Sequence, residues 1–322
     1  MILKYQKIFS QYLESSITER SPKNLYDPCN YILSLGGKRI RPIMLLLTHD
    51  CINKNSTSAL PAALSIELFH NFTLIHDDIM DEAILRRGKT TIHKKWNLNT
   101  GILSGDVMLI WSYQCLELYD SKLFKKLTSL LNNTSRMVCE GQQYDIDFTK
   151  ISKVSKKDYL KMIKLKTAVL LGCSMKMGAL IGGLSESESD KFYFYGINLG
   201  IAFQLKDDYL DVFGENEKFG KKNGGDIIEN KKTLMYIFAL NNSDKNQKSR
   251  LIKFFTEKPL KSKLKIKSVR EIFLKTGADK DIKKEIKYYE KKAMEGIKSF
   301  SVSDINKKIF EKLTIDLMSR EI

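Results

Sequence analysis

Residues that break helices are scarce in this sequence. Only 5 prolines and 18 glycines occur in 322 residues, and no series of alternating β-branched segments predicts a sheet. We therefore expect an all-α protein. No apolar run approaches the roughly 18 residues needed to span a bilayer, and the N-terminal segment MILKYQKIFSQYLESS carries scattered charges. These absences argue against stable membrane insertion and a signal peptide, and we expect a cytoplasmic protein.

The sequence also lacks the side-chain patterns of several enzyme and metal-site classes. Its 5 cysteines are widely spaced, odd in number and free of any CxxC pair, so neither a disulfide framework nor a zinc site is expected. The 4 histidines form no HxxxH or HExxH pattern. No Ser/His/Asp or Cys/His constellation is present to supply a protein nucleophile.

Acidic residues are outnumbered, and the formal net charge is +16. A basic surface can mark nucleic-acid binding. However, the excess is almost all lysine, is spread along the chain, and is densest near residues 244–268 and 278–292 without any interleaved aromatic motif. Solvated helix faces explain this pattern, and a positive potential would also attract anionic diphosphates. Nucleic-acid binding is kept as a remote alternative.

Against this background, two acidic clusters are conspicuous. Residues 72–81 read FTLIHDDIMD, and an i,i+4 pair and an i,i+3 pair of carboxylates there crowd one helix face at roughly 5–6 Å. Residues 203–213, FQLKDDYLDVF, repeat the same DDxxD spacing. Mg²⁺ takes one or two protein carboxylates and completes its octahedron with waters and phosphate oxygens. Two such clusters facing one cavity could hold a diphosphate through shared metal ions.

Helices dominate the expected organisation. Pro61 resembles a helix start, and the apolar-periodic run 62–83 would form one long helix that ends in the first cluster. The segment 214–233 is predicted to be a long loop able to close over the site, and GlyGly pairs at 36–37, 182–183 and 224–225 punctuate the helices. Further helices are predicted at 102–118, 157–184, 192–212 and 231–240. Because the two clusters make sense only if they converge, one domain over 1–322 is expected.

Basic motifs accompany the clusters. GGKRIRP places Lys38 and Arg41 at the start of a helix that should begin near Pro42, where an anion would be favoured. Arg86 and Arg87 follow the first cluster and could clamp a second diphosphate. In MIKLKTAVLLG, Lys166 lies within an apolar helical stretch, so its ammonium group must either extend to water or bind an anion.

Together these motifs resemble the trans-isoprenyl diphosphate synthases, the polyprenyl synthetase family that includes geranylgeranyl and farnesyl diphosphate synthases. The resemblance runs from GGKRIRP to GGDIIENKKT and includes DDIMD and DDYLD. It implies an all-α bundle of ten or more helices around a central cavity, assembled as a homodimer. The implied reaction is a Mg²⁺-dependent, head-to-tail (1'-4) condensation of isopentenyl diphosphate with an allylic diphosphate.

Carried over motif by motif, the resemblance assigns roles to individual residues. The metal ligands would be Asp77, Asp81, Asp207 and Asp211, which would hold three Mg²⁺ ions with substrate bound. Isopentenyl diphosphate would be bound by Lys38, Arg41, His70 and Arg87. The allylic diphosphate would be surrounded by Arg86, Lys166, Thr167, Gln204, Lys221 and Lys231, of which Lys166, Thr167 and Gln204 would also be catalytic.

Product length is expected to depend on the helix that precedes the first cluster. Phe72, five residues before Asp77, occupies the position where an aromatic side chain in short-chain members of the family forms a floor, with Phe69 one turn deeper. A C20 product is expected, with C15 or a longer chain as the alternative.

Three related classes of protein fit the motifs less well. A terpene cyclase should lack both GGKRIRP and the second DDxxD, and a squalene- or phytoene-type synthase should show other acidic motifs. A non-catalytic subunit tends to have lost one cluster.

Overall fold

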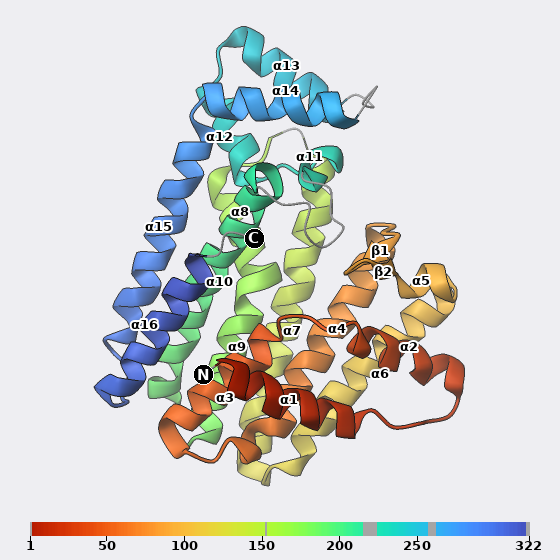
Figure 1. Ribbon diagram of the computed structural model, residues 1–322, viewed down its shortest axis with the longest axis vertical. Coiled ribbons are helices and arrows are strands. Elements are labelled where there is room, and N and C mark those ends of the chain that lie inside the picture. Colours follow the sequence, from red (N-terminus) through yellow and green to blue (C-terminus); the bar gives the residue numbers. More distant parts are fainter. Residues whose placement is uncertain (1, 152, 215–223, 257–261, 320–322) are drawn as a thin grey trace. The chain divides into compact units, whose positions relative to one another are not determined.

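The computed structural model describes residues 2–151, 153–214, 224–256 and 262–319. These residues are overwhelmingly helical, with more than ten helices and a single two-stranded antiparallel ribbon, which confirms the all-α prediction (Figure 1). The chain separates into two compact units, of which the first comprises 1–133 and 173–193 and the second 134–172 and 194–322. That the chain is one domain stays a prediction.

The first unit contains the elements up to residue 118, among them the helix that ends in the first aspartate cluster. Its elements are α1 (Ile2–Ser16), α2 (Lys23–Ser34), α3 (Ile40–Asn53), η1 (Ser56–Ala59), α4 (Leu60–Met80), β1 (Leu85–Arg86), β2 (Lys89–Thr90), α5 (Ile92–Lys95), α6 (Leu98–Gln114) and η2 (Cys115–Leu118).

The second unit contains most of the elements after residue 133. It comprises α8 (Lys156–Ile163), the π-helical segment η3 (Lys164–Ala168), α11 (Gly225–Ile228), α12 (Leu234–Asn242), α13 (Lys245–Thr256), α14 (Ser262–Lys275), α15 (Ala278–Ile297) and α16 (Asp304–Met318). Three long helices contribute residues to both units: α7 (Ser121–Lys150), α9 (Val169–Ile181) and α10 (Glu186–Phe213).

Helix α4 lies at the centre of the first unit because it is apolar on almost every side. Leu64, Ile66 and Phe69 are at most 3% exposed. Helix α6 packs closely against it, and a Cβ atom at Gly105 would lie 2.3 Å from Nε2 of His76. Glycine at this position therefore sets how near α6 can approach the turn of α4 that precedes the aspartates.

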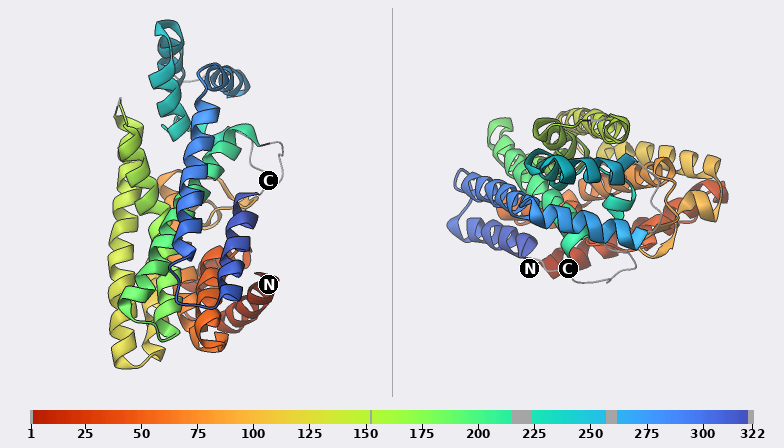
Figure 2. Two further views of the ribbon diagram at one scale, coloured as in Figure 1. Left: turned by 90° about the vertical axis from the view of Figure 1, so that its left-hand side faces the viewer. Right: turned by 90° about the horizontal axis from the view of Figure 1, so that it is seen from above.

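An aromatic cluster forms part of the core of the second unit. The ring of Tyr195 lies 5.5 Å from that of Phe300 and 5.9 Å from that of Phe310, in edge-to-face geometry. The Tyr195 hydroxyl lies 2.7 Å from Oγ1 of Thr314 in α16, and burial raises its pKa. Figures 1 and 2 show α16 lying alongside α15.

Several predicted boundaries need correction. The helix predicted over 157–184 is three segments, because the π-helical turn η3 interrupts it and α9 ends at Ile181. The predicted loop 214–233 contains the short helix α11, and a helix over 121–150 was not predicted at all. The β1–β2 hairpin was also unexpected. Helices α4 and α10 extend over the predicted ranges to within a few residues at their ends, except that α10 begins at Glu186.

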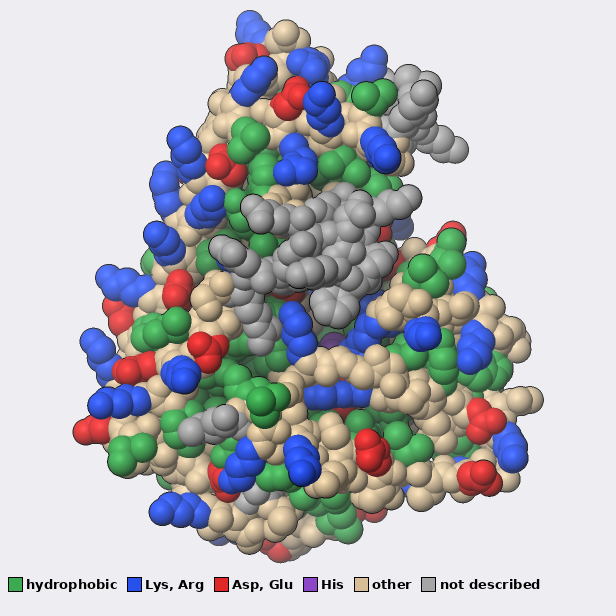
Figure 3. All heavy atoms as spheres, viewed as in Figure 1, with side chains coloured by type: hydrophobic (Ala, Val, Ile, Leu, Met, Phe, Trp, Pro, Cys, Tyr) green, Lys and Arg blue, Asp and Glu red, His purple; other side chains and the backbone are tan. Residues whose placement is uncertain are grey.

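No helix among the described residues is long and apolar enough to cross a membrane. On the face drawn in Figure 3, lysine and arginine side chains lie over every part of the described surface and do not gather in one patch. On this face, the distribution fits solvated helix faces.

Candidate active site

The first aspartate cluster ends helix α4. Asp77 and Asp78 lie in its last turn, and Asp81 caps it by donating its backbone N–H to the carbonyl of Asp77 at 2.8 Å. The three carboxylates differ in exposure: Asp78 is only 2% exposed, Asp77 is half-buried and Asp81 is exposed. The outer two are therefore the ones accessible to a ligand.

The middle carboxylate is occupied by an arginine. Arg86, on strand β1, donates from Nε to both carboxylate oxygens of Asp78 at 3.0 and 3.1 Å, and from Nη2 to Oδ1 at 2.5 Å. Burial raises the pKa of Asp78, an effect that the Arg86 charge opposes. Burial, the largest single cause, would lower the Arg86 pKa, but the hydrogen bond to Asp78 and the charges of the three aspartates together outweigh it and raise that pKa. Arg86 thus orders the cluster, and its predicted contact with the allylic diphosphate stays a prediction.

The β1–β2 turn brings Arg87 to the glycine pair of the GGKR segment. Arg87 and Gly88 both have positive φ, of 52° and 74°, which makes the tight connection. The guanidinium donates to the carbonyl oxygen of Gly36. A Cβ atom at Gly37, whose φ is 126°, would lie 2.8 Å from Cζ of Arg87, so the guanidinium rests directly on this backbone.

A buried ion pair anchors the same segment. Arg39 donates to Glu67 of α4 and to the carbonyl of Leu33, and Asn71 donates to Glu67 from the next turn at 2.8 Å. The two charged side chains are 7% and 2% exposed. Arg39 therefore has a structural role, whereas Lys38 and Arg41, which lie close to it in the sequence, are predicted ligands of isopentenyl diphosphate.

Two of the predicted isopentenyl diphosphate ligands meet directly. Nη1 of Arg41 lies 3.2 Å from Nε2 of His70. Burial, followed by the positive charges of Arg41 and Arg87, holds the His70 pKa well below its ordinary value. The ring is therefore neutral at neutral pH, and its lone pair can accept from Arg41. The first unit thus brings Arg41, His70 and Arg87 together around the GGKR segment.

The second aspartate cluster lies in the last two turns of α10. Like the first, it has a buried middle aspartate and two more exposed outer aspartates. Asp208 is 4% exposed, whereas Asp207 and Asp211 are half-buried. Oδ1 of Asp208 accepts from Gln204 at 2.9 Å, and Oδ2 accepts from the Tyr159 hydroxyl. Burial, the largest cause, and the Asp226 charge raise the Asp208 pKa to about 8, although the hydrogen bonds from Tyr159 and Gln204 act to lower it. The middle aspartate is again an internal acceptor.

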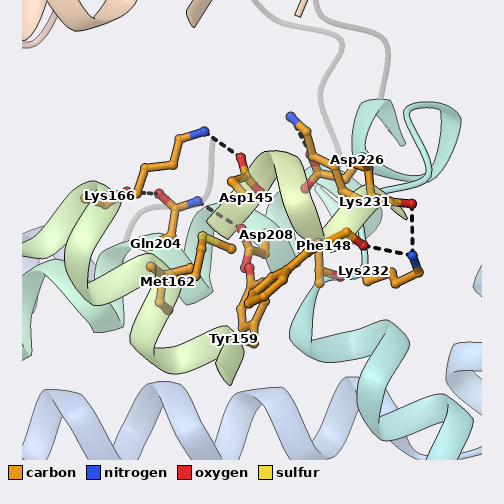
Figure 4. Close-up of a pocket in the computed structure, with 14 residues that line it drawn as sticks. Asp145, Phe148, Tyr159, Met162, Lys166, Gln204, Asp208, Asp226, Lys231 and Lys232 are labelled. Carbon is orange, nitrogen blue, oxygen red and sulfur yellow. Dashed lines mark hydrogen bonds and ion pairs between the residues drawn. The ribbon is translucent and has the colours of Figure 1, made fainter. Parts of the chain in front are cut away.

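A cavity of about 110 Å³ within the second unit joins this cluster to the predicted catalytic residues (Figure 4). Lys166 pairs with Asp145 at 2.6 Å, and the Thr167 hydroxyl donates to Oε1 of Gln204 at 3.1 Å. The lining residues are Asp145, Phe148, Thr149, Tyr159, Met162, Ile163, Lys166, Thr167, Gln204, Asp208, Asp226, Lys231, Lys232 and Thr233.

Lys166 and Thr167 lie in the π-helical segment η3, which widens the helix by one residue where they face the cavity. Helix α7 passes very close to this turn. A Cβ atom at Gly141 would lie 2.2 Å from the backbone nitrogen of Lys166, an impossible contact. Gly141 therefore permits the approach that places Asp145, one turn later on α7, against Lys166.

Lys231 and Lys232 take different positions at the other side of the cavity. Lys231 pairs with Glu229 at 2.8 Å and lies 3.9 Å from Asp226. Lys232 donates to the carbonyl oxygens of Phe148 and Thr149 at 2.8 and 3.2 Å and of Ile151 at 2.6 Å, and so caps the end of α7. Lys221, the remaining predicted ligand in this region, lies outside the described residues.

The chemistry of the outer carboxylates fits Mg²⁺. Among the described residues, no three His, Cys, Asp or Glu side chains lie close enough together to hold a metal by themselves. Mg²⁺ needs only one or two protein carboxylates when phosphate oxygens and waters complete its shell. Asp77 and Asp81 in one unit, and Asp207 and Asp211 in the other, provide accessible pairs of this kind.

The polar cavity residues that sequence reasoning did not single out include Asp145, Tyr159 and Asp226. In the sequence, each is an ordinary polar residue of a helix. The partner of Asp145, Lys166, is 21 residues away, and the partner of Tyr159, Asp208, is 49 residues away. The only signal for Asp145 was its position on the polar side of the segment GQQYDIDF, one turn after a glycine.

Comparison with known proteins agrees with the fold and the motifs. A sequence model of the family described as polyprenyl synthetase matches residues 22–273. A geranylgeranyl diphosphate synthase of Methanosarcina mazei is 39% identical over 236 residues, which cover 71% of this chain and 73% of the relative.

Solved structures are similar over the full length. A crystal structure of a geranylgeranyl pyrophosphate synthase is 44% identical with a TM-score of 0.96, and the match covers 100% of this chain and 99% of the other. The geranylgeranyl pyrophosphate synthetase of the archaeon Geoglobus acetivorans is 30% identical with a TM-score of 0.89, over 99% of both chains. The chain therefore belongs to the polyprenyl synthetase family of prenyltransferases.

Proposed function

We propose that this prenyltransferase condenses isopentenyl diphosphate with an allylic diphosphate, head to tail, and releases geranylgeranyl diphosphate. The observation that carries the proposal is the shared construction of the two DDxxD motifs. In each, the middle aspartate is almost fully buried and accepts from protein side chains, whereas the outer two are more exposed. Of the outer aspartates, Asp211 also accepts at Oδ2 from the backbone N–H of Asp226 at 3.1 Å. Two accessible carboxylate pairs on rigid helices suit a diphosphate held through Mg²⁺.

In this proposal, the outer aspartates of both clusters hold the metal ions, three in number with substrate bound. Bound Mg²⁺ would neutralise charge on the diphosphate that departs from the allylic carbon. The four residues are Asp77, Asp81, Asp207 and Asp211. The proposal requires that the two clusters converge on one diphosphate.

The basic residues of the first unit would bind isopentenyl diphosphate. Lys38, Arg41 and Arg87 supply positive charge, and neutral His70 accepts a hydrogen bond from Arg41 and so fixes its direction. Anchoring by the buried Arg39–Glu67 pair keeps the loop that bears Lys38 in place.

The cavity of the second unit would surround the reacting allylic carbon. As the allylic C–O bond breaks, positive charge spreads over the allylic carbons, and the oxygen atoms of Thr167 and Gln204 face it. Lys166 and Lys231, with Lys221 and Arg86, would bind the departing diphosphate. The isopentenyl double bond then attacks, and a proton passes to the released diphosphate, so no protein nucleophile is needed.

Phe72 is the side chain that we expect to limit product length. It is half-buried, with its ring 5.6 Å from that of Phe69 and 4.8 Å from that of His76. Phe69 is fully buried and lies behind it. A growing chain that descends along α4 from Asp77 would thus meet Phe72 first, and Phe69 would support its ring.

Product analysis tests this assignment. Phe72→Ala should shift the product from C20 toward longer chains with little loss of total isopentenyl incorporation, because the floor has been lowered by about one helical turn of ~5.4 Å. Phe9→Ala removes an equally large, fully buried ring of the same unit from α1 and should leave the product length unchanged. An unchanged distribution in an active Phe72→Ala enzyme would place the floor elsewhere.

We also propose that the enzyme works as a homodimer. Helix α6 exposes several large apolar side chains on its outer side, interrupted by the exposed Asp106: Leu98, Ile102, Leu103 and Ile110 are 53%, 40%, 58% and 58% exposed. A second copy would cover this side. Leu103→Asp combined with Ile110→Asp should halve the mass measured by light scattering, and a wild-type mass of 37 kDa would reject the proposal. The cytoplasmic location stays a prediction.

A further inference from the structure

Gln204 and Thr167 form only the accessible end of a longer hydrogen-bond chain. Starting from α8, the buried Tyr159 hydroxyl donates to Oδ2 of Asp208, and Oδ1 of the same carboxylate accepts from Nε2 of Gln204 at 2.9 Å. Oε1 of Gln204 then accepts from the Thr167 hydroxyl at 3.1 Å. All four residues line the cavity of the second unit, and Figure 4 shows three of them converging on it.

The direction of this chain is fixed at its buried end. A carboxyl oxygen that carries no proton can only accept hydrogen bonds, and Oδ1 of Asp208 accepts from Nε2 of Gln204. The Gln204 amide therefore turns its NH₂ group toward Asp208 and its oxygen toward Thr167. The opposite orientation would place two acceptors against each other in a buried position, which costs about 1–3 kcal/mol for the unsatisfied groups. Asp208 therefore determines which end of the amide faces Thr167.

The polarity of Thr167 follows from that of Gln204. A threonine hydroxyl has one proton and two lone pairs. Because the proton is donated to Gln204, the hydroxyl can present only lone pairs to the cavity. With the amide reversed, the Thr167 proton would be released toward the cavity, where it would repel a developing positive charge.

Tyr159 holds the carboxylate in the rotation that this chain requires. It is 4% exposed, and its helix α8 leads directly into η3, the π-helical segment that carries Thr167. The network thus connects α8, η3 and α10 by bonds that end at Thr167. Without the Tyr159 hydroxyl, Oδ2 of Asp208 would lose a donor, and the carboxylate could rotate away from Gln204.

We propose that Tyr159 and Asp208 are positioning residues that orient the Gln204 amide, and through it the Thr167 hydroxyl, so that only oxygen lone pairs face the allylic cation. This inference rests on the proposed function. It assigns to the middle aspartate of the second motif a role other than metal binding, and it gives the buried tyrosine a part in catalysis without substrate contact.

The test is a comparison of Tyr159→Phe with Tyr195→Phe, measured as kcat and KM for both substrates. Each variant deletes one buried tyrosine hydroxyl within the second unit, but that of Tyr195 bonds to Thr314 in α16, away from the cavity. Tyr159→Phe should lower kcat by about tenfold to a hundredfold, the scale of a small misplacement of reacting groups. The KM for isopentenyl diphosphate should not change, and Tyr195→Phe should keep the wild-type kcat.

A double variant tests whether Tyr159 acts through Gln204. If it does, Tyr159→Phe added to Gln204→Leu should lower kcat no further than Gln204→Leu alone. Multiplicative effects of the two substitutions, a wild-type kcat in Tyr159→Phe, or an equal loss in Tyr195→Phe would each overturn the inference while wild-type turnover stands. Absence of turnover in the wild-type enzyme would overturn the proposed function and this inference together.

Discussion

At the scale of single residues, each DDxxD motif uses its three carboxylates in two different ways. Asp78 and Asp208 are buried acceptors of protein donors, and their neighbours are left accessible. The sequence alone identified the two clusters, because the spacing is visible in the chain, and the assignment of the outer aspartates as metal ligands stays a prediction. The sequence could not identify Tyr159 or Asp145 as partners, because a contact between distant helices depends on how those helices pack.

The two classes of aspartate should respond differently to the same substitution. Asp78→Asn leaves the Arg86 guanidinium, whose side chain is 25% exposed, without its carboxylate, and should lower the free energy of unfolding by about 3 kcal/mol. Asp77→Asn should change that free energy by less than about 1 kcal/mol but lower kcat by about 10³-fold. Urea unfolding and steady-state turnover of both variants measure these effects.

A matched pair of substitutions separates charge from packing. The double variant Asp78→Leu/Arg86→Met removes both charges and should recover a large part of the stability lost in Asp78→Asn, since no unpaired ion remains. Equal stability of Asp78→Asn and wild type would show that the Asp78–Arg86 pair contributes little to the fold.

At the scale of elements, apolar periodicity predicted the long helices α4 and α10 because both carry buried residues through several turns. No helix was predicted over 121–150, although Leu127, Leu131 and Val138 recur there at helical spacing and are buried. The sequence pattern also could not reveal the π-helical turn in 164–168. A π turn changes the backbone without changing composition. The turn lies where α7 passes close to it at Gly141, a tertiary contact that composition does not reveal.

Gly141→Ala tests this account of the π turn. The added methyl group would meet the backbone of Leu165 and Lys166 at 2.2–2.7 Å, so α7 must move away and carry Asp145 with it. We expect a loss of stability of about 2–3 kcal/mol and a clear fall in kcat, measured by urea unfolding and turnover.

A helical glycine elsewhere in the second unit provides the control. A Cβ atom at Gly296 in α15 would have no neighbour nearer than 3.8 Å, so Gly296→Ala should stabilise the protein by up to about 1 kcal/mol through helix propensity. If Gly141→Ala behaved like Gly296→Ala, the close approach of α7 to η3 would not be required for activity.

At the scale of the whole molecule, the net charge of +16 is distributed over many helix faces, and the specific function depends on a small number of ordered groups. The all-α fold and the family were predictable from the sequence because the motifs lie within single helices or their ends. What the sequence could not supply is the hydrogen-bond order inside each motif, which distinguishes a ligand from a structural acceptor.

The measurement that tests the central claim most directly is incorporation of labelled isopentenyl diphosphate by the purified protein. Dimethylallyl, geranyl or farnesyl diphosphate serves as the primer, with Mg²⁺ or with EDTA, and the dephosphorylated products are separated by chain length. The account predicts a C20 product with Mg²⁺, no product with EDTA, and losses of about 10²–10³-fold in both Asp77→Asn and Asp207→Asn. Absence of incorporation with every primer, turnover that persists in EDTA, or near-wild-type turnover in either variant would contradict it.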